Sequence, residues 1–438
     1  MGNLKPESNE GKPYRESLDY LYSLQKFGMI FGLEKVEGIL KAIGNPHEAL
    51  STIHVGGTNG KGSTAAMMAS ILEKEGYRVG LYTSPHLLRF TERIKVNGEE
   101  IAEEEVASLT EWMRERIEAA GVSPSFTFFD FTTAMALSYF NQKVVDLAIL
   151  EVGLGGRLDS TNVVTPLLSI VTNISRDHED VLGRGILRIA REKAGIIKEG
   201  RPFITAATQP RVLRLFSDRC RELGAPFYRV GKEFQYRTVG PERLDYEGRH
   251  WKLWNIELGL RGSYQMRNAA TALGAIEVLE ELGYRISVEA IMEGLRTVRW
   301  PGRLETVSSA PKVVVDGAHN PAGVESLREA LKEGSPYRRL ILLVGIMKDK
   351  PFQSMLRILS PLADHIILSR PSIERAAAPH RLWKAMGENR GKAEVVEDLR
   401  EAIERGLSMT EEGDLFCITG SLYTAGEALS YFESRRGS

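Results

Sequence analysis

The sequence predicts an α/β fold in two domains, a larger N-terminal domain with a mainly parallel sheet and a smaller C-terminal α/β domain. Near-continuous apolar runs alternate with helical patterns along the chain, which is typical of parallel strands covered on both faces. A Trp-Pro-Gly turn at residues 300–302 interrupts this alternation. The 438 residues are enough for two or three domains, at roughly 100–200 residues per domain.

The composition is that of a globular protein without an unusual partner. Apolar residues make up 42% of the chain and charged residues 26%, and the net charge of −1 provides no general attraction to nucleic acid or anionic lipid. Cys220 and Cys417 are too far apart for a zinc motif or a disulfide scaffold. Residues 1–15 lack the apolar core of a signal peptide, and no apolar run approaches the roughly 20 residues that span a bilayer. We therefore expect a cytoplasmic protein that binds neither membrane nor nucleic acid.

The first part of the chain follows the order of a parallel sheet. A glycine-rich loop separates an apolar strand from a helix, and a second strand follows that helix. A Gly-Asn-Pro sequence at 44–46 stops the helix before the first strand. The elements expected are helices at 14–26 and 33–43, a strand at 52–55, a helix at 63–75 and a strand at 77–83.

The later elements continue the alternation in two series. Before the turn we expect strands at 146–152 and 167–174, a small antiparallel β excursion within 225–262, and helices at 268–282 and 288–295. After the turn, five apolar runs alternate with helical patterns and predict a Rossmann-like domain. These runs are 312–316, 340–345, 365–369, 394–396 and 415–419. The predicted boundaries are 1–298 for the first domain, 299–303 for the linker and 304–438 for the second domain.

The loop from Gly57 to Ser63 has the features of a phosphate-binding loop. Its backbone N–H groups, placed before a helix, form a nest for phosphate oxygens. Lys61 is positioned to reach the β- and γ-phosphates, and the hydroxyl of Ser63 or Thr64 to lie near phosphate or Mg²⁺. The loop departs from the usual P-loop pattern because Gly62 separates the lysine from the hydroxyl residue. The first domain is therefore predicted to be a P-loop ATPase domain, the alternative being a glycine-rich turn without a ligand.

Four further candidates lie at the ends of predicted strands, where ligands of open α/β sheets bind. They are Ser84, Glu151, His178 and Lys193. Mg²⁺ favours oxygen ligands and borrows some from nucleotide phosphates, so Glu151 is a natural ligand, Ser84 a plausible one and His178 a softer one. Spacing alone supports only Glu151, because a turn serine, a surface histidine and a solvated lysine would give the same pattern.

The segment from Asp316 to Pro321, Asp-Gly-Ala-His-Asn-Pro, ends a predicted strand of the second domain. An aspartate and a histidine there suit a ribose or an amino-acid ligand, and an Asx turn that caps the next helix is the alternative. By contrast, residues 153–156 lack the spacing of a dinucleotide-binding fingerprint.

Ten stretches, in order along nearly the whole chain, resemble those of folylpolyglutamate synthases, including bacterial enzymes that also act as dihydrofolate synthases, within the Mur ligase superfamily. They are HVGGTNGKGS (54–63), YTSPHLLRFTERI (82–94), LEVGLGGRLDSTN (150–162), DHEDVLG (177–183), IAREKAGI (189–196), SYQMRNAATAL (263–273), WPGRLE (300–305), DGAHNPAG (316–323), GIMKDK (345–350) and TGSLYTAGE (419–427). The resemblance implies that ATP phosphorylates a carboxylate of a folate or of dihydropteroate. The amino group of L-glutamate then attacks the acyl phosphate. It also implies a monomer that uses ATP and two Mg²⁺ sites.

The resemblance assigns a role to individual residues. ATP is expected to contact Thr58, Asn59, Gly60, Lys61, Gly62, Ser63, Asn268, Arg303 and Asp316. Mg²⁺ is assigned to Ser84, Glu151 and His178, and Lys193 matches a lysine that the family carries as an N-carboxylate. The pterin-binding segments match Thr127, Phe128, Phe129 and Asp130, and Leu158, Asp159 and Ser160. His319 and Ser421 match positions linked to glutamate, and Lys61, Lys193 and His319 are the expected catalytic residues.

The sequence departs from the family pattern at two positions, and two other functions remain as alternatives. Asp130 stands where the family usually has glutamate, which shortens the reach by one methylene and bears on pterin contact, and Gly56 replaces another small residue. A UDP-muramoyl amino-acid ligase is the first alternative. Such enzymes usually lack the extra glycine and often have a third domain, for which the residues before the loop are too few. A non-catalytic P-loop binding module is the second.

Overall fold

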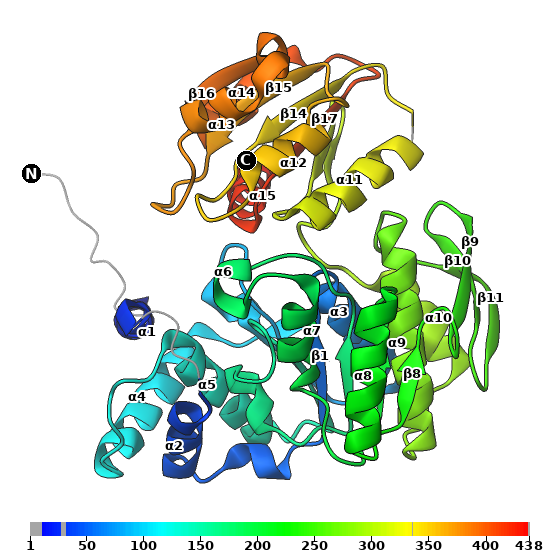
Figure 1. Cartoon of the computed structure of the whole chain (residues 1–438). Coiled ribbons are helices and arrows are strands. Elements are labelled where there is room, and N and C mark those ends of the chain that lie inside the picture. The colour runs from blue at the N-terminus through cyan, green and yellow to red at the C-terminus, as the bar shows by residue number, and fades with distance from the viewer. Residues whose placement is uncertain (1–10, 28–31, 335, 437–438) are drawn as a thin grey trace, which may run out of the picture.

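The computed structural model describes residues 11–27, 32–334 and 336–436, which form two α/β domains (Figure 1). The helices expected near the N-terminus are confirmed, as α1 (Lys12–Ser23) and α2 (Glu34–Ala42). In the described part of the chain, no helix combines the length and apolarity needed to cross a bilayer. The boundary at residues 299–303 stays a prediction, between α10 and the first strand of the second domain.

The sheet of the N-terminal domain has eight strands in the order β4-β3-β2-β5-β1-β6-β7-β8. The pairs from β2 to β8 are parallel. The two pairs that involve β3, at the β4 edge of the sheet, are antiparallel. The central strand β1 lies between β5 and β6, so the loops that follow these three strands meet at one edge. The strands are β1 (Thr52–Gly56), β2 (Val79–Tyr82), β3 (Ile94–Val96), β4 (Glu99–Glu100), β5 (Leu147–Glu151), β6 (Leu168–Val171), β7 (Phe203–Thr205) and β8 (Phe227–Arg229).

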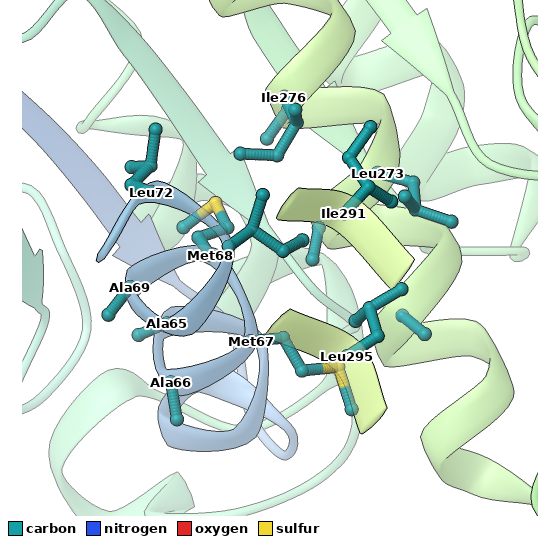
Figure 2. Close-up of a cluster of buried hydrophobic side chains, with 14 of the residues drawn as sticks. Ala65, Ala66, Met67, Met68, Ala69, Leu72, Leu273, Ile276, Ile291 and Leu295 are labelled. Carbon is teal, nitrogen blue, oxygen red and sulfur yellow. The ribbon is translucent and has the colours of Figure 1, made fainter. Parts of the chain in front are cut away.

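Helices cover this sheet because each has an apolar face. The helix after the phosphate loop, α3 (Lys61–Glu75), packs with α9 (Tyr264–Glu281) and α10 (Val288–Thr297). Figure 2 shows Met67 and Met68 of α3 among the apolar side chains of those two helices. A second cluster forms around α4 (Glu103–Ala119) and α5 (Phe128–Gln142), with α1 and α2. A third lies under α7 (Ile186–Ala194) and α8 (Pro210–Glu222), which follow the short α6 (Glu179–Leu182).

The predicted β excursion is confirmed in part. Its antiparallel sheet comprises β9 (Gln235–Gly240), β10 (Arg243–Glu247) and β11 (Lys252–Glu257). The beginning of the predicted segment instead forms β8, which adds a parallel strand to the main sheet. The cause is tertiary packing, because the ring of Phe227 stacks on Phe203 of the neighbouring strand, with centroids 5.9 Å apart.

The C-terminal domain contains all five predicted strands, in a sheet ordered β12-β13-β17-β14-β15-β16. The edge strand β12 (Glu305–Ser309) was not predicted, since its polar sequence lacks a continuous apolar run and it pairs antiparallel to β13. The predicted strands are β13 (Lys312–Val315), β14 (Leu340–Val344), β15 (His365–Arg370), β16 (Ala393–Asp398) and β17 (Leu415–Thr419). The helices are α11 (Pro321–Glu333), α12 (Phe352–Leu359), α13 (Pro379–Ala385), α14 (Leu399–Met409) and α15 (Leu422–Arg436).

A glycine allows α10 to approach α3 closely. A Cβ at Gly294 would lie 2.6 Å from the Cα of Ile71, which is backbone and cannot turn away. We expect Gly294→Ala to lower the free energy of unfolding by about 1–3 kcal/mol, the usual cost of overpacking a core. Urea unfolding measures this change.

Gly38→Ala is the matched control, since Gly38 also lies within a helix but its added Cβ would meet only Val122 Cγ1, at an ordinary 3.5 Å. This control should be neutral or stabilising, because alanine favours helix more than glycine by about 1 kcal/mol. Equal unfolding energies for the Gly294 variant and the wild type would contradict the close helix contact.

Candidate active site

A cavity of about 550 Å³ lies where the carboxyl ends of the first sheet face the C-terminal domain. Its walls come from the loops after β1, β2, β5 and β6 on one side and after β13 on the other. The cavity brings together every residue that was predicted to contact ATP or metal, together with Lys193 and His319. These are Thr58, Asn59, Gly60, Lys61, Gly62, Ser63, Ser84, Glu151, His178, Asn268, Arg303 and Asp316.

The phosphate loop is held in shape by the end of β6. The N–H of Thr58 donates to the carbonyl of Asn173 at 3.0 Å, and the N–H of Asn59 donates to the side-chain oxygen of Asn173 at 3.0 Å. The Thr172 hydroxyl donates to the Asn59 carbonyl at 2.7 Å. Gly57 has a φ of +137° and presses against Thr172, so only glycine fits there. These contacts fix the backbone of the phosphate loop.

The extra glycine of the loop has a physical reason in the structure. A Cβ at Gly62 would lie 2.9 Å from the ring carbon Cζ2 of Trp300. Trp300 belongs to the turn between the domains, and its indole packs directly on the first turn of α3. The next residue, Ser63, is buried and its hydroxyl accepts from Gln265 Nε2 at 3.3 Å. Gly62 thus makes room for contact between the linker and the phosphate loop.

Glu151 is a buried carboxylate with little countercharge. One of its oxygens accepts from the N–H of Ser84 at 3.1 Å, and the other lies 3.8 Å from Lys61 Nζ. Burial raises the pKa of Glu151, and the Lys61 ammonium opposes this shift. A cation near Glu151 would stabilise its ionised form.

His178 follows β6 with a left-handed φ of 52°, and its Nε2 lies 3.1 Å from Lys350 Nζ. Among the described residues no group of three or more His, Cys, Asp and Glu side chains could hold a metal alone. The carboxylate of Glu151, the hydroxyl of Ser84 and the imidazole of His178 all line the cavity.

Asp177 connects the two domains at the mouth of this region. Its carboxylate accepts from Lys350 Nζ of the C-terminal domain at 2.8 Å, and His319 Nε2 lies 3.8 Å away. Burial raises the pKa of Asp177, but its neighbours, Lys350 first among them, together hold the pKa well below its usual range. Asp177 is therefore an anion at neutral pH.

His319 is neutral in this environment. Burial, helped by the charge of Lys350, lowers the pKa of His319 to about 4. Its Nδ1 lies 3.0 Å from the carbonyl of Gly317, which can only accept, so Nδ1 carries the hydrogen. Its Nε2 is left with a free lone pair.

Lys193, on the last turn of α7, is a lysine that lines the cavity. Its side chain is buried, and its Nζ donates to the carbonyl of Gly57 at 2.8 Å. Within the described parts of the chain no carboxylate lies close enough to form an ion pair with it. Burial and, to a smaller extent, the Lys61 ammonium lower the pKa of Lys193 to about 7. A large fraction of this amine is therefore uncharged at neutral pH.

The opposite wall carries the remaining ATP candidates. Asn268 of α9 faces the loop so closely that a Cβ at Gly60 would lie 2.4 Å from its side-chain oxygen. Asp316 is buried and accepts from the N–H groups of Leu304 and Ala318, both at 2.9 Å. Arg303 lies beside Asp316 and opposes the rise that burial causes in the pKa of that carboxyl. These residues place a polar wall opposite the phosphate loop.

The predicted pterin segments do not line the cavity but lie behind its wall. Asp130 uses one oxygen to accept from Thr127 and the other to accept from Ser160, at 2.8 and 2.6 Å. Asp159 accepts from the N–H of Leu154 at 2.7 Å. The Phe129 ring touches the wall at Gly153, where a Cβ would lie 2.5 Å from it. The buried carboxylates of these segments therefore bond to residues of the protein behind the cavity wall.

Ser421 also lies outside the cavity lining, although the next residue, Leu422, reaches it. Its hydroxyl oxygen accepts from the N–H of Thr424 at 3.0 Å, at the start of α15. Four residues to which the sequence prediction gave no role also belong to this region. Asp177 lines the cavity, and Asn320, Lys350 and Trp300 contact residues that line it. All four lay inside the matched stretches, but only their contacts across the domain interface reveal what they touch.

Family models and known relatives match nearly the whole chain. The model of the Mur ligase middle domain matches residues 55–276, and that of the Mur ligase glutamate ligase domain matches 302–422. The dihydrofolate synthase/folylpolyglutamate synthase of Bacillus subtilis is 38% identical over 429 residues, which cover 94% of this chain and 97% of the relative. The Escherichia coli protein of the same name is 34% identical, with 99% of each chain covered.

Solved structures agree with this similarity. Mycobacterium tuberculosis folylpolyglutamate synthase complexed with ADP has a TM-score of 0.90 at 31% identity, covering 96% of this chain and 99% of that one. Escherichia coli FolC in complex with DHPP and ADP has a TM-score of 0.88 at 33% identity, covering 96% and 98%. The chain therefore belongs to the Mur ligase family, in the branch of the folylpolyglutamate and dihydrofolate synthases.

Proposed function

We propose that this protein is an ATP-dependent ligase that joins L-glutamate to a folate and also to dihydropteroate. The observation that carries the proposal is the cavity between the domains, which is lined by a phosphate loop, a buried carboxylate and a buried lysine. Membership of the folylpolyglutamate and dihydrofolate synthase branch supports the choice of substrates. A cytoplasmic enzyme is also proposed, on the balanced charge and sparse cysteines of the sequence, and a monomer on the resemblance to the family.

The reaction has two steps. A carboxylate oxygen of the folate attacks the γ-phosphorus of ATP, the bond to the β–γ bridging oxygen breaks, and ADP leaves. The nitrogen of glutamate then attacks the acyl phosphate carbon, phosphate departs, and the nitrogen loses a proton. Phosphoryl transfer depends chiefly on positioning and charge neutralisation, which the loop N–H groups and Lys61 supply. A closed cleft keeps water from the acyl phosphate.

Ser84, Glu151 and His178 would hold Mg²⁺. The fit rests on Glu151, a buried carboxylate whose nearest cation, Lys61, is 3.8 Å away. Bound there, Mg²⁺ would neutralise phosphate charge during the transfer. Lys350, now beside His178 Nε2, would have to move away from that nitrogen.

Lys193 is proposed to carry a carboxylate on its nitrogen. Only an unprotonated amine attacks CO₂, and the pKa of about 7 makes this form abundant at neutral pH. The new N–C bond gives a carbamate, and the amine releases one proton. The resulting anion would favour a second Mg²⁺, which an ammonium would repel.

The substrates are proposed to enter from two sides. His319 offers an unprotonated Nε2 to the amino group of glutamate. The pterin would use the rings of Phe128 and Phe129 more than the carboxylate of Asp130, whose oxygens are occupied. Phe128 is already stacked on Tyr22, with centroids 5.7 Å apart. Leu158, Asp159 and Ser160 would support this pocket, and Ser421 would act on glutamate through the start of α15.

The proposed function is tested by measuring ADP and amide with dihydropteroate and with tetrahydrofolate in parallel assays. We expect glutamate-dependent ADP and an equal amount of amide with both. Formation of ADP only with UDP-muramoyl substrates would instead identify a cell-wall ligase. The absence of any amino-acid-dependent ADP would indicate a binding module.

Lys193→Ala removes the proposed carbamate. We expect kcat to fall by about 100-fold, the cost of losing one electrostatic group in a catalytic site, and a short carboxylic acid to restore part of it. Lys198→Ala is the matched control, because Lys198 follows the same helix but donates to the carbonyl of Asn162 outside the cavity. Full activity of Lys193→Ala would rule out the carbamate role.

The low pKa of Lys193 also predicts a pH dependence of stability. Between pH 7 and the usual lysine pKa of about 10.4, the unfolded chain holds a proton that the folded chain lacks. Stability therefore rises with pH in this window, by up to about 1.4 kcal/mol for each pH unit. Without CO₂ or nucleotide, the unfolding energy of the wild type should rise relative to that of Lys193→Met. A difference independent of pH would show that Lys193 is protonated in the fold.

A further inference from the structure

Asn320 is a fully buried amide at the start of α11, and its hydrogen-bonding capacity is completely used. Its Oδ1 accepts from the N–H of Gly323 at 2.8 Å and from Asn59 Nδ2 at 3.1 Å. Its Nδ2 donates to Asn59 Oδ1 at 2.9 Å and to Asp177 Oδ2 at 2.8 Å. Two donor hydrogens and two acceptor positions are all that this side chain has.

These bonds join the two domains at the phosphate loop. Asn59 lies inside the loop, and both ends of its side-chain amide pair with Asn320 across the interface. Asp177 follows β6, the strand whose end also holds the loop backbone. Lys350 of the C-terminal domain completes the group by donating to Asp177 at 2.8 Å. One buried side chain of the C-terminal domain thus contacts two loops of the N-terminal domain.

Capping α11 alone does not require asparagine. Serine, threonine and aspartate cap helices about as well, because each offers an oxygen to the first N–H groups. Only an amide can donate to Asp177 while it both donates to and accepts from Asn59. An aspartate would place a second carboxylate against Asp177, and serine could not reach both partners. The identity of residue 320 therefore follows from the contacts across the interface.

We propose that Asn320 is a positioning residue, through which the C-terminal domain holds the phosphate loop in the shape that binds nucleotide. This proposal rests on the proposed function only in assuming that the loop binds ATP. Buried reciprocal hydrogen bonds restrict the loop before the ligand arrives, so less ordering is needed on binding. Because they cross the domain interface, they also couple the shape of the loop to the position of the C-terminal domain.

Asn320→Ser tests the proposal, because it keeps the helix cap and removes the bonds to Asn59 and Asp177. The affinity for a Mg²⁺ complex of a non-hydrolysable ATP analogue is measured by titration calorimetry on the full chain. We expect binding about tenfold weaker, the size expected for one or two net hydrogen bonds. The KM for ATP should rise similarly, while the melting temperature stays close to that of the wild type.

Asn59→Ser provides the second arm of a double-mutant cycle. It should weaken binding as well, and adding Asn320→Ser to it should cost less than Asn320→Ser costs alone, because the two side chains share a pair of hydrogen bonds. Asp398→Ser is the control, since Asp398 caps α14 through the N–H of Glu401 and lies away from the cavity. It should leave nucleotide affinity unchanged.

Wild-type affinity in Asn320→Ser, or fully additive losses in the double variant, would overturn the proposal. If Asn320→Ser fails to fold, wild-type affinity in Asn59→Ser alone would also overturn it. Because affinity is measured without turnover, the result does not depend on whether the wild type forms the amide. Failure of the ligase function would appear in the product assay instead.

Discussion

The structure depends on charge that is buried between two domains without enough countercharge. The Glu151 carboxylate lies 3.8 Å from Lys61 Nζ, and Lys193 donates to a carbonyl rather than to an acid. Burying an unpaired ion is costly, so such groups change their protonation or bind an ion of opposite charge. The proposed reaction uses both the change of protonation and the binding of an ion. An uncharged lysine can take up CO₂, and a buried carboxylate can hold Mg²⁺ beside the phosphates.

The fold produces this arrangement through the position of one strand. With β1 between β5 and β6, the phosphate loop, Glu151 and Asp177 all follow neighbouring strands and meet at one edge. The C-terminal domain then covers that edge. Trp300 packs against Gly62, and Asn320 pairs with Asn59, so the linker and the second domain both touch the phosphate loop. The phosphate loop is therefore also part of the interface between the domains.

Much of this could be predicted from sequence, because strand periodicity and loop chemistry are local. The phosphate loop was recognisable from its glycines, and Glu151 from its place at a strand end. Tertiary packing determined what was missed: Phe227 joined the main sheet through Phe203. The motif match named Asp130 and Ser421 as substrate contacts, yet their polar atoms bond within the protein. The packing of Trp300 on Gly62 could not be inferred either, since it joins residues far apart in sequence.

The central claim is that this cleft transfers the γ-phosphoryl group to a substrate carboxylate and keeps water away from the product. Labelling the folate carboxylate with ¹⁸O follows the oxygen that attacks phosphorus. If an acyl phosphate forms, the glutamate nitrogen displaces that oxygen, and each released phosphate carries one labelled atom. Mass spectrometry of the phosphate should therefore show a single ¹⁸O for every amide formed. Unlabelled phosphate released together with amide would contradict the account.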